Sequence, residues 1–349
     1  MTIRVAHVLR GDHNHHVGGD LIQLQASVEG LCDLGIDAFA TTSDDLDSSV
    51  NLVHIYNLQL PFELWRGLQR ARQVAPRAPV VLSPIYWPVD ISAVRAERRN
   101  SRVSRPLHWI GPRRRSEWLL NRRALNAVAA VLPNSQIETL RLQKFFRMSS
   151  SDRWRVVPNG LWIDRWEVDS SIRRTRGAPL RIACVARLEP QKNQRRLVEA
   201  VRRLGSADLT LVGPSGEHRY AASVLNELAA LGARGRWIER LDQPHLKKLL
   251  SNVHVHVLPS FRETPGLASM EAAAAGCAIV TTKEGSAEEY FGDLASYSDP
   301  RSTTDISAAI AHAAAHSNQP ALRKRMQQYD WSRVCKVLAQ IYRDVLTHA

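Results

Sequence analysis

The chain alternates short apolar segments with helical segments, and this alternation limits its fold more than any other feature. The apolar segments are rich in β-branched residues and poor in polar ones, which is typical of strands buried on both faces of a parallel sheet. They lie at residues 3–9, 36–42, 51–57, 79–86, 130–134 and 154–160, and a second series lies at 181–187, 208–213, 236–240, 253–260 and 278–282. The sequence therefore predicts an α/β protein with two doubly wound domains.

A polar and charged segment separates the two series of strands. Residues 165–180 have no clear period and are interpreted as an interdomain linker. The N-terminal domain is therefore expected at residues 1–164 and the C-terminal domain at residues 181–329, which suits a length of 349 residues. The last segment, residues 330–349, has helical periodicity and is followed by no strand, so it can pack on either domain.

The apolar runs and the cysteines both favour a cytoplasmic protein. The longest apolar run, residues 272–280, is about half as long as a membrane span requires. The apolar stretch at the N-terminus is too short for a signal peptide. The cysteines have no C-x-x-C spacing, which favours reduced thiols over a disulfide framework or a zinc site; they are Cys32, Cys184, Cys277 and Cys335.

The charge of the chain is strongly positive and partly concentrated in one segment. The net charge is +13, which favours anionic partners. Residues 95–123 hold ten Arg against two Glu, with Trp109 and Trp118 among them, and Arg113, Arg114 and Arg115 are consecutive. Three interpretations stay open: a solvated loop, a surface for an anionic membrane or a lipid-diphosphate acceptor, and a nucleic-acid site.

A pair of glutamates brackets the start of a predicted helix at residues 262–276, RETPGLASMEAAAAG. This stretch follows a strand, so it lies at the carboxyl edge of the sheet, where open α/β folds bind ligands. Thr264 is expected to cap the helix, Pro265 to be its first residue and Gly276 to end it. The free amides of Gly266, Leu267 and Ala268 would then form a phosphate site.

The two carboxylates suit opposite ends of a nucleotide ligand. Glu271 lies six residues beyond Pro265, or about 9 Å along a helix, which is about the distance from a diphosphate to its ribose. A carboxylate can accept two hydrogen bonds from a vicinal diol. Glu263 precedes the helix and would meet the other end of the ligand.

Two further turns could contribute phosphate contacts. Arg187 ends a strand and Lys192 follows five residues later, and two fixed cations at such a turn suit a diphosphate. Gly18 and Gly19 follow the first strand and permit a tight turn with exposed amides, although the G-x-G-x-x-G fingerprint of dinucleotide-binding folds is absent.

Two possible metal sites have weaker support. The histidines of the first turn raise the question of a metal, but they lie on a predicted loop with no clear fourth ligand; they are His13, His15 and His16. Asp45 and Asp47 fit the D-x-D pattern of metal-dependent transferases, but they lie in a polar loop, and the duplicated α/β pattern disfavours that fold.

Four motifs in this order resemble the family-4 retaining glycosyltransferases of the GT-B fold, the bacterial glycosyl transferase group 1. The motifs are GGD at 18–20, VVPNG at 156–160, ARLEPQKN at 186–193 and ETPGLASME at 263–271. The resemblance implies two Rossmann-like domains that face each other across a cleft, with the N-terminal domain on the acceptor side. It also implies that the last helix crosses back onto the N-terminal domain.

The resemblance further implies roles for individual residues. Arg187 and Lys192 would hold the diphosphate with the amides at Gly266 and Leu267, Glu271 would hold the ribose, and Glu263 would contact the donor sugar. The loop of Gly18 and Gly19 would close over the donor. With Arg187, Lys192 and Glu263 as catalytic residues, the leaving phosphate would accept the proton of the acceptor.

The chain departs from the family pattern at several positions. A histidine that often contacts the sugar is missing where this chain has Ser83, Pro84 and Tyr86, and Tyr86 is taken as a residue of the acceptor or membrane side, together with Arg113, Arg114 and Arg115. Ala186 and Asn193 stand where glycine is common.

The expected activity is transfer of a sugar from a UDP- or GDP-sugar, with retained configuration and without a metal or other cofactor. The acceptor would be a sugar, a lipid-linked molecule or a protein, in cell-surface polysaccharide or glycoconjugate synthesis. Partners would include an anionic membrane surface if the protein is peripheral on the cytoplasmic face, and no nucleic acid is expected. Two alternatives remain: a related enzyme that epimerises or hydrolyses a nucleotide-sugar, and a basic nucleic-acid-binding protein.

Overall fold

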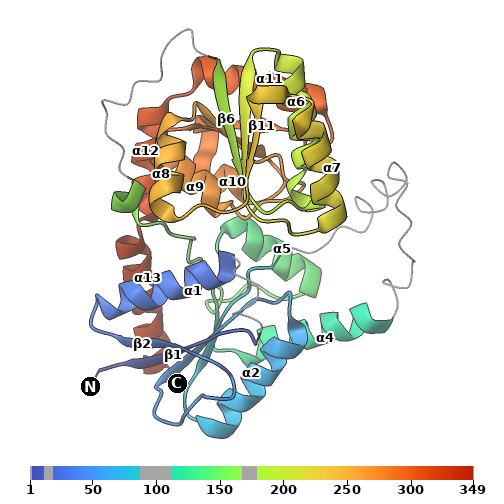
Figure 1. Cartoon of the computed structure of the whole chain (residues 1–349). Helices are drawn as coiled ribbons and strands as arrows, with labels where there is room; N and C mark the ends of the chain where they lie inside the picture. Colours follow the sequence, from blue (N-terminus) through green and yellow to red (C-terminus); the bar gives the residue numbers. More distant parts are fainter. Residues whose placement is uncertain (1, 12–18, 87–111, 167–178, 349) are drawn as a thin grey trace. The chain divides into compact units, whose positions relative to one another are not determined.

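The computed structural model describes residues 2–11, 19–86, 112–166 and 179–348, with the backbone alone at 112–114. These residues form two compact units (Figure 1). The N-terminal unit comprises Met1–Asn159 and Trp331–Ala349, and the C-terminal unit comprises Gly160–Asp330.

The N-terminal unit is built on a five-stranded parallel sheet with the order β2-β1-β3-β4-β5. Buried aliphatic side chains cover both faces of this sheet, α1 and α13 on one face and α2, α4 and α5 on the other. The strands are β1 (Arg4–Val8), β2 (Asp37–Thr41), β3 (Leu52–Tyr56), β4 (Val80–Ser83) and β5 (Ala130–Val131). The helices are α1 (Gly19–Cys32), α2 (Pro61–Val74), α4 (Pro112–Ala127), α5 (Gln136–Phe146) and α13 (Trp331–Thr347).

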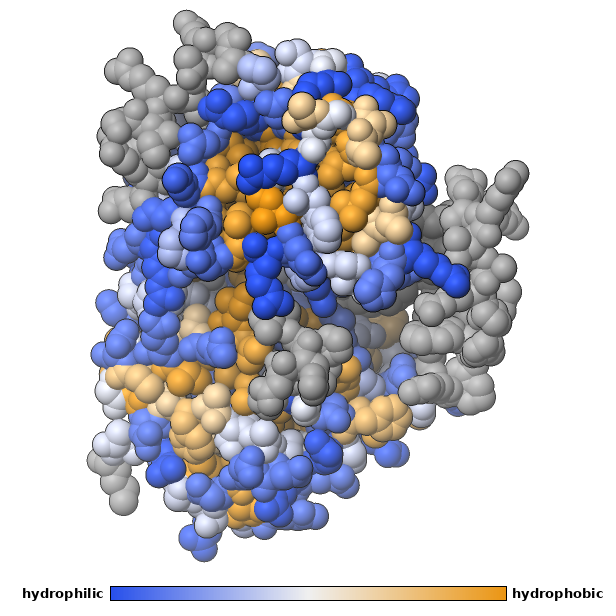
Figure 2. Space-filling model, viewed as in Figure 1, coloured by the Kyte–Doolittle hydropathy of each residue, from blue (hydrophilic) through white to orange (hydrophobic). Residues whose placement is uncertain are grey.

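The C-terminal unit is built on a six-stranded parallel sheet with the order β11-β10-β9-β6-β7-β8. One face packs on α6, α7 and α11, and the other on α8, α9, α10 and α12. The strands are β6 (Leu180–Val185), β7 (Ala207–Val212), β8 (Gly235–Ile238), β9 (Val255–Val257), β10 (Ala278–Thr282) and β11 (Ser296–Ser298). The helices are α6 (Gln194–Leu204), α7 (His218–Ala229), α8 (Gln243–Asn252), α9 (Leu267–Ala274), α10 (Ala287–Phe291), α11 (Thr303–His316) and α12 (Gln319–Met326). Figure 2 shows apolar side chains on the viewed face of this unit in the region of α9, with hydrophilic side chains around them.

Two strand assignments differ from the sequence prediction. Residues 154–160 do not form a strand: Trp154 makes one bridge to Val131, and the chain then reaches Pro158, which has no N–H to donate. The edge strand β11 was missed because it is only three residues long and two of them are serine.

The boundary between the units falls earlier than the sequence indicates. The N–H of Leu161 donates to the carbonyl of Tyr329 at 3.0 Å, and the N–H of Ile163 donates to the carboxylate of Asp330 at 3.1 Å. Through these hydrogen bonds, residues 160–166 belong to the C-terminal unit. Most of the segment interpreted as a linker, residues 167–178, lies outside the described residues.

The last helix, α13, belongs to the N-terminal unit. Its side chains Leu338 and Tyr342 are buried with those of the sheet and of α1. The hydroxyl of Tyr342 lies 2.6 Å from Nδ1 of His54, and Asp344 forms an ion pair with Arg155. In the part of the chain that the structure describes, α13 and the other helices are all too short or too polar to cross a membrane.

Candidate functional site

The carboxyl ends of β6 and β9 bring together side chains that are far apart in sequence. The two strands are neighbours in the sheet, so the turn after β6 and the segment after β9 share one edge. At this edge Nζ of Lys192 donates to Oε2 of Glu263 at 2.8 Å, across 71 positions of sequence. The side chains are 20% and 9% exposed, which makes this a largely buried ion pair.

Glu263 is held in place through its side chain and its backbone. The hydroxyl of Ser260, itself buried, donates to the same Oε2 at 2.9 Å. The N–H of Glu263 donates to the carbonyl of Glu284 at 2.9 Å, and the N–H of Ser286 donates to the carbonyl of Glu263 at 3.1 Å. A Cβ at Gly285 would lie 1.8 Å from that carbonyl oxygen, so only glycine fits beside Glu263. Ser260 and Gly285 were missed, because nothing local in the sequence indicates their contacts with Glu263.

Asn193 connects the turn of Lys192 by a hydrogen bond to the segment that carries Glu263. It adopts the left-handed conformation with φ 59°, which asparagine tolerates better than most residues. Its side-chain amide donates to the carbonyl of Pro259 at 3.1 Å and to that of Pro300 at 2.7 Å. The N–H of Phe261 also donates to the carbonyl of Gln191 at 2.9 Å. Asparagine at this position therefore adopts the left-handed conformation of the turn and also connects it to two distant segments.

Arg187 lies on the same turn but is not part of the Lys192–Glu263 pair. Its Nε lies 3.1 Å from Oε1 of Glu189, and its side chain is 46% exposed. Arg187 is thus an accessible cation beside the buried pair.

The helix after Glu263 begins two residues later than the sequence indicates. Gly266 is the cap and Leu267 the first residue of α9, so Thr264 and Pro265 lie in the turn before the helix. The φ of +92° at Gly266 is outside the helical region and suits glycine. The amides of Leu267 and Ala268 lie in the first turn, where no intrahelical carbonyl is available to them. A Cβ at Gly266 would lie 2.9 Å from Cγ of Glu263, so this helix start packs against the buried carboxylate.

Gly276 ends α9 as predicted. It has a φ of +81°, and its N–H donates to the carbonyl of Ala273 at 3.0 Å. The N–H of Cys277 donates to the carbonyl of Ala272 at 2.9 Å, which completes a Schellman motif.

Glu271 lies on α9, one turn beyond its start, with a partly buried side chain. Desolvation by burial raises its pKa from 4.5 to about 8. Among the described residues, none forms a hydrogen bond or an ion pair with its carboxyl group. The group therefore has hydrogen-bonding capacity available for a ligand, at a cost to the charged form.

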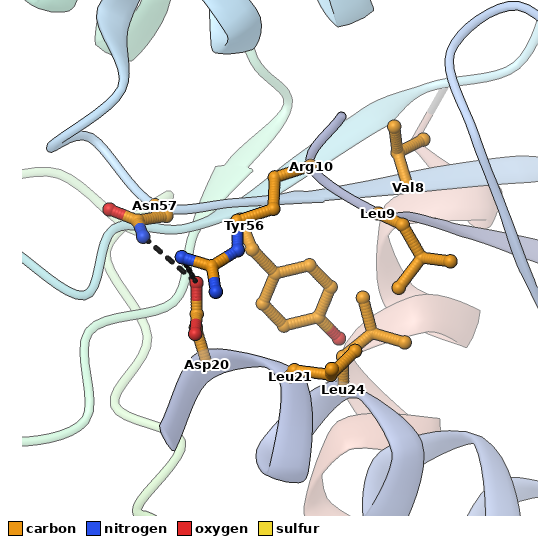
Figure 3. Close-up of a pocket in the computed structure, with 8 residues that line it drawn as sticks. All are labelled: Val8, Leu9, Arg10, Asp20, Leu21, Leu24, Tyr56 and Asn57. Carbon is orange, nitrogen blue, oxygen red and sulfur yellow. Dashed lines mark hydrogen bonds and ion pairs between the residues drawn. The ribbon is translucent and has the colours of Figure 1, made fainter. Parts of the chain in front are cut away.

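The first turn of the N-terminal unit is described only in part. Gly19 begins α1, whereas Gly18 and the three histidines, His13, His15 and His16, lie outside the described residues. Asp20 lies 3.4 Å from Nη1 of Arg10 and accepts a hydrogen bond from Asn57 at 3.0 Å. These side chains edge a small pocket at the ends of β1 and β3 (Figure 3). Its other lining residues are Val8, Leu9, Leu21, Leu24 and Tyr56.

The candidates at Ser83 and Tyr86 have local structural partners. Ser83 lies 2.9 Å from Nε2 of the buried His54. The N–H of Tyr86 donates to Oε1 of Glu138 at 2.8 Å, and its ring lies 5.5 Å from that of Phe146. Pro84 accepts from the N–H of Leu58 at 2.7 Å.

The arginines and aspartates singled out in the N-terminal half lie on α4 and in the loop between β2 and β3. Arg113, Arg114 and Arg115 begin α4, and the side chain of Arg115 is exposed. Asp45 accepts from the Thr42 hydroxyl at 2.6 Å, and hydrogen bonds from Ser49 lower the pKa of Asp47. Those two aspartates therefore have local roles in their loop. Over the described ranges, no three His, Cys, Asp or Glu side chains are grouped as a metal site would require.

Comparison with known proteins agrees with this arrangement. Residues 167–331 match the family described as Glycosyl transferases group 1. The chain is similar to the glycogen synthase of Mycobacterium tuberculosis, with 31% identity over 199 residues, covering 54% of this chain and 47% of that protein. It is 27% identical over 251 residues to the α-maltose-1-phosphate synthase of Mycolicibacterium smegmatis, covering 64% of each. The chain thus matches about half to two thirds of the length of these curated relatives.

Solved structures match nearly the whole chain. The sucrose-phosphate synthase of Thermosynechococcus elongatus has a TM-score of 0.79 at 17% identity and covers 99% of this chain and 100% of its own. Anabaena HepE in complex with UDP and glucose has a TM-score of 0.71 at 16% identity and covers 97% and 99%. These likenesses show the GT-B fold. The family match itself covers residues 167–331, which lie almost wholly in the C-terminal unit.

Proposed function

We propose that this protein transfers a sugar, with retained configuration, from a nucleoside-diphosphate sugar to an acceptor. The observation that carries the proposal is the buried Lys192–Glu263 pair, which adjoins the start of α9, with Glu271 one turn further along that helix. The cations and the free amides would meet the diphosphate of such a donor, and the carboxylate of Glu271 would meet its ribose. A solved relative of the same fold, Anabaena HepE, binds UDP-glucose, which supports this class of donor.

Positively charged and N–H groups that are in place before the donor binds would hold its diphosphate. Arg187 provides a planar fork and Lys192 a point charge, and both suit phosphate oxygens. The amides of Leu267 and Ala268 add the positive end of a helix dipole. The leaving diphosphate gains charge as the glycosidic bond breaks, so these groups would stabilise the transition state more than the bound donor. For this reason we propose that no metal is needed.

Glu271 and Glu263 would hold the two ends of the donor. The carboxyl group of Glu271 would bind the ribose hydroxyls, which supply the hydrogen bonds it lacks in the protein. Glu263 would contact the sugar, and its pairing with Lys192 fixes its orientation before the donor arrives. Tyr86, on the N-terminal unit, would be a residue of the acceptor side.

The acceptor would lose its proton to the departing phosphate oxygen, on the face from which the diphosphate leaves. Attack on that face retains the configuration of the sugar. A sugar, a lipid-linked molecule or a protein could serve as acceptor in glycoconjugate or polysaccharide synthesis. The reaction would occur in the cytoplasm or at the cytoplasmic face of a membrane.

Replacement of Lys192 tests the catalytic assignment. Lys192→Ala should lower kcat by roughly 100-fold, the scale for loss of one preorganised electrostatic group. Donor affinity should fall less, because the charge that Lys192 meets grows in the transition state. Steady-state kinetics with UDP- and GDP-sugars in excess EDTA measure both quantities.

One control variant and two contradicting outcomes complete this test. Lys248→Ala removes an exposed cation of α8 in the same unit and should leave kcat unchanged. A near-normal kcat in Lys192→Ala would exclude the phosphate role. Release of free sugar without transfer to any acceptor would favour a hydrolase instead.

A further inference from the structure

The exposed side of α4 combines cations with an apolar side chain. Arg115, Leu119, Arg122 and Arg123 are exposed and follow helical spacing, so they lie on one side of the helix. Leu119 is 41% exposed. We name these four residues the α4 face.

The neighbouring helix α5 extends this surface. Nε1 of Trp118 donates to the carbonyl of Phe145 at 3.0 Å, and the guanidinium of Arg122 lies 5.6 Å from the centre of the Trp118 ring. Phe145 is 39% exposed, and Lys144 beside it is exposed as well. Both α4 and α5 therefore carry exposed apolar and cationic side chains.

The cations of this surface differ from those of a comparable helix in the other unit. Within the described residues, Arg115, Arg122, Arg123 and Lys144 form no ion pair. On α6, by contrast, Arg195 pairs with Glu227 at 2.7 Å and Arg203 pairs with Glu199 at 3.2 Å. General arginine enrichment does not explain this difference, because it applies to both helices. The α4 face therefore carries positive charge that no residue in the described part of the chain neutralises through an ion pair.

We propose that the α4 face, with Lys144 and Phe145, docks on an anionic lipid bilayer. Each cation near such a surface contributes on the order of 1 kcal/mol, and together they supply reversible attraction. Leu119 favours lipid over nucleic acid, because leucine cannot stack on bases but can enter the boundary of the acyl chains. The inference concerns the N-terminal unit and does not depend on the donor roles proposed above.

A pair of matched variants tests this docking by sedimentation with vesicles. Arg122→Gln/Arg123→Gln should weaken binding to phosphatidylglycerol-containing vesicles by about 30-fold, from about 1 kcal/mol for each lost cation. Arg202→Gln/Arg203→Gln also removes two consecutive positive charges, from the last turn of α6, and should leave vesicle binding unchanged. Binding should also disappear on pure phosphatidylcholine and at 1 M salt, where the Debye length is about 3 Å.

A third variant separates lipid contact from general attraction to anions. Leu119→Ser keeps every charge and should weaken vesicle binding several-fold. Thermal unfolding and nucleotide titration of all variants confirm that each one is folded. Equal loss in the α4 and α6 variants, no binding by the wild type at low salt, or no effect of Leu119→Ser would overturn the proposal. Tighter binding to single-stranded RNA than to vesicles, lost in the α4 variant, would assign the face to nucleic acid instead.

Discussion

At the scale of single residues, Glu271 shows a conflict between stability and the proposed function. Burial raises its pKa to about 8, and no described residue compensates its charge. A carboxyl group that served only the fold would be paired or replaced by an uncharged residue. Its place on α9 is explained if a ligand supplies the missing hydrogen bonds.

Glu271→Gln should stabilise the free protein at alkaline pH. The folded-state pKa is raised above the usual 4.5, so the native state binds more protons than the unfolded state between about pH 4.5 and 8. The stability of the wild type therefore falls as the pH rises through this window, whereas glutamine does not titrate. Thermal unfolding should show Glu271→Gln more stable by up to about 4 kcal/mol at pH 8, and nearly equal to the wild type at pH 4.5.

The same variant should bind the nucleotide diphosphate less well. Each hydrogen bond contributes roughly 0.5–1.5 kcal/mol, so weakening the two bonds to the ribose hydroxyls should lower the affinity by roughly 10-fold or more. Calorimetric titration measures this loss. A variant that is more stable yet binds UDP and GDP as the wild type does would exclude the ribose role and leave Glu271 without explanation.

At the scale of elements, one sheet edge gathers residues from three segments of the chain. The turn after β6 carries Lys192, the segment after β9 carries Glu263, and the turn after β10 carries Gly285. Asn193 connects the first two of these segments through its side chain. The position of Lys192 therefore depends on contacts between its turn and distant segments of the chain.

Asn193→Gly should distinguish the effect of the left-handed backbone conformation from the effect of the side-chain hydrogen bonds. Glycine accepts the left-handed φ of 59°, but the hydrogen bonds to Pro259 and Pro300 are lost. Each such bond contributes roughly 1 kcal/mol, so stability should fall by about 2 kcal/mol and kcat by about 10-fold. Asn193→Ala adds backbone strain of about 1–2 kcal/mol and should be less stable still.

The tether would have no part in positioning Lys192 if kcat stayed normal in Asn193→Gly while stability fell. Thermal unfolding and steady-state kinetics on the same preparations distinguish these outcomes.

At the scale of the whole molecule, the last helix returns the chain from the C-terminal unit to the N-terminal one. Residues up to Asp330 belong to the C-terminal unit, and α13 begins at the next residue. Helix α13 packs on α1 and reaches the sheet through Tyr342, whose hydroxyl meets the buried His54. The N-terminal unit is therefore completed by a helix that follows the whole C-terminal unit in the sequence.

Tyr342→Phe should loosen α13 without unfolding the C-terminal unit. The ring and its packing remain, but His54 loses a partner at 2.6 Å in a buried site. The hydroxyl of Tyr56, 3.1 Å from the same nitrogen, can compensate part of the loss, so we expect a cost of about 1–2 kcal/mol. Hydrogen exchange should become faster in α13 and β3 and stay unchanged in β6 and β7. Equal acceleration in both units would show that they unfold together.

The sequence determined the class of fold because burial on both faces of a parallel sheet leaves a periodic signal in each segment. It also located Lys192, Glu263, Gly266 and Glu271 at turns and at a helix start, since strand ends and glycines are local features. Strand order, in contrast, brings β6 beside β9 across more than 70 positions, and only the tertiary structure shows the resulting contact between Lys192 and Glu263. The same holds for Ser260, Gly285 and the tether of Asn193, because a hydrogen bond or a close approach between distant segments has no periodicity of its own. Burial likewise depends on the packed neighbours, and for this reason the raised pKa of Glu271 appears only in the folded molecule.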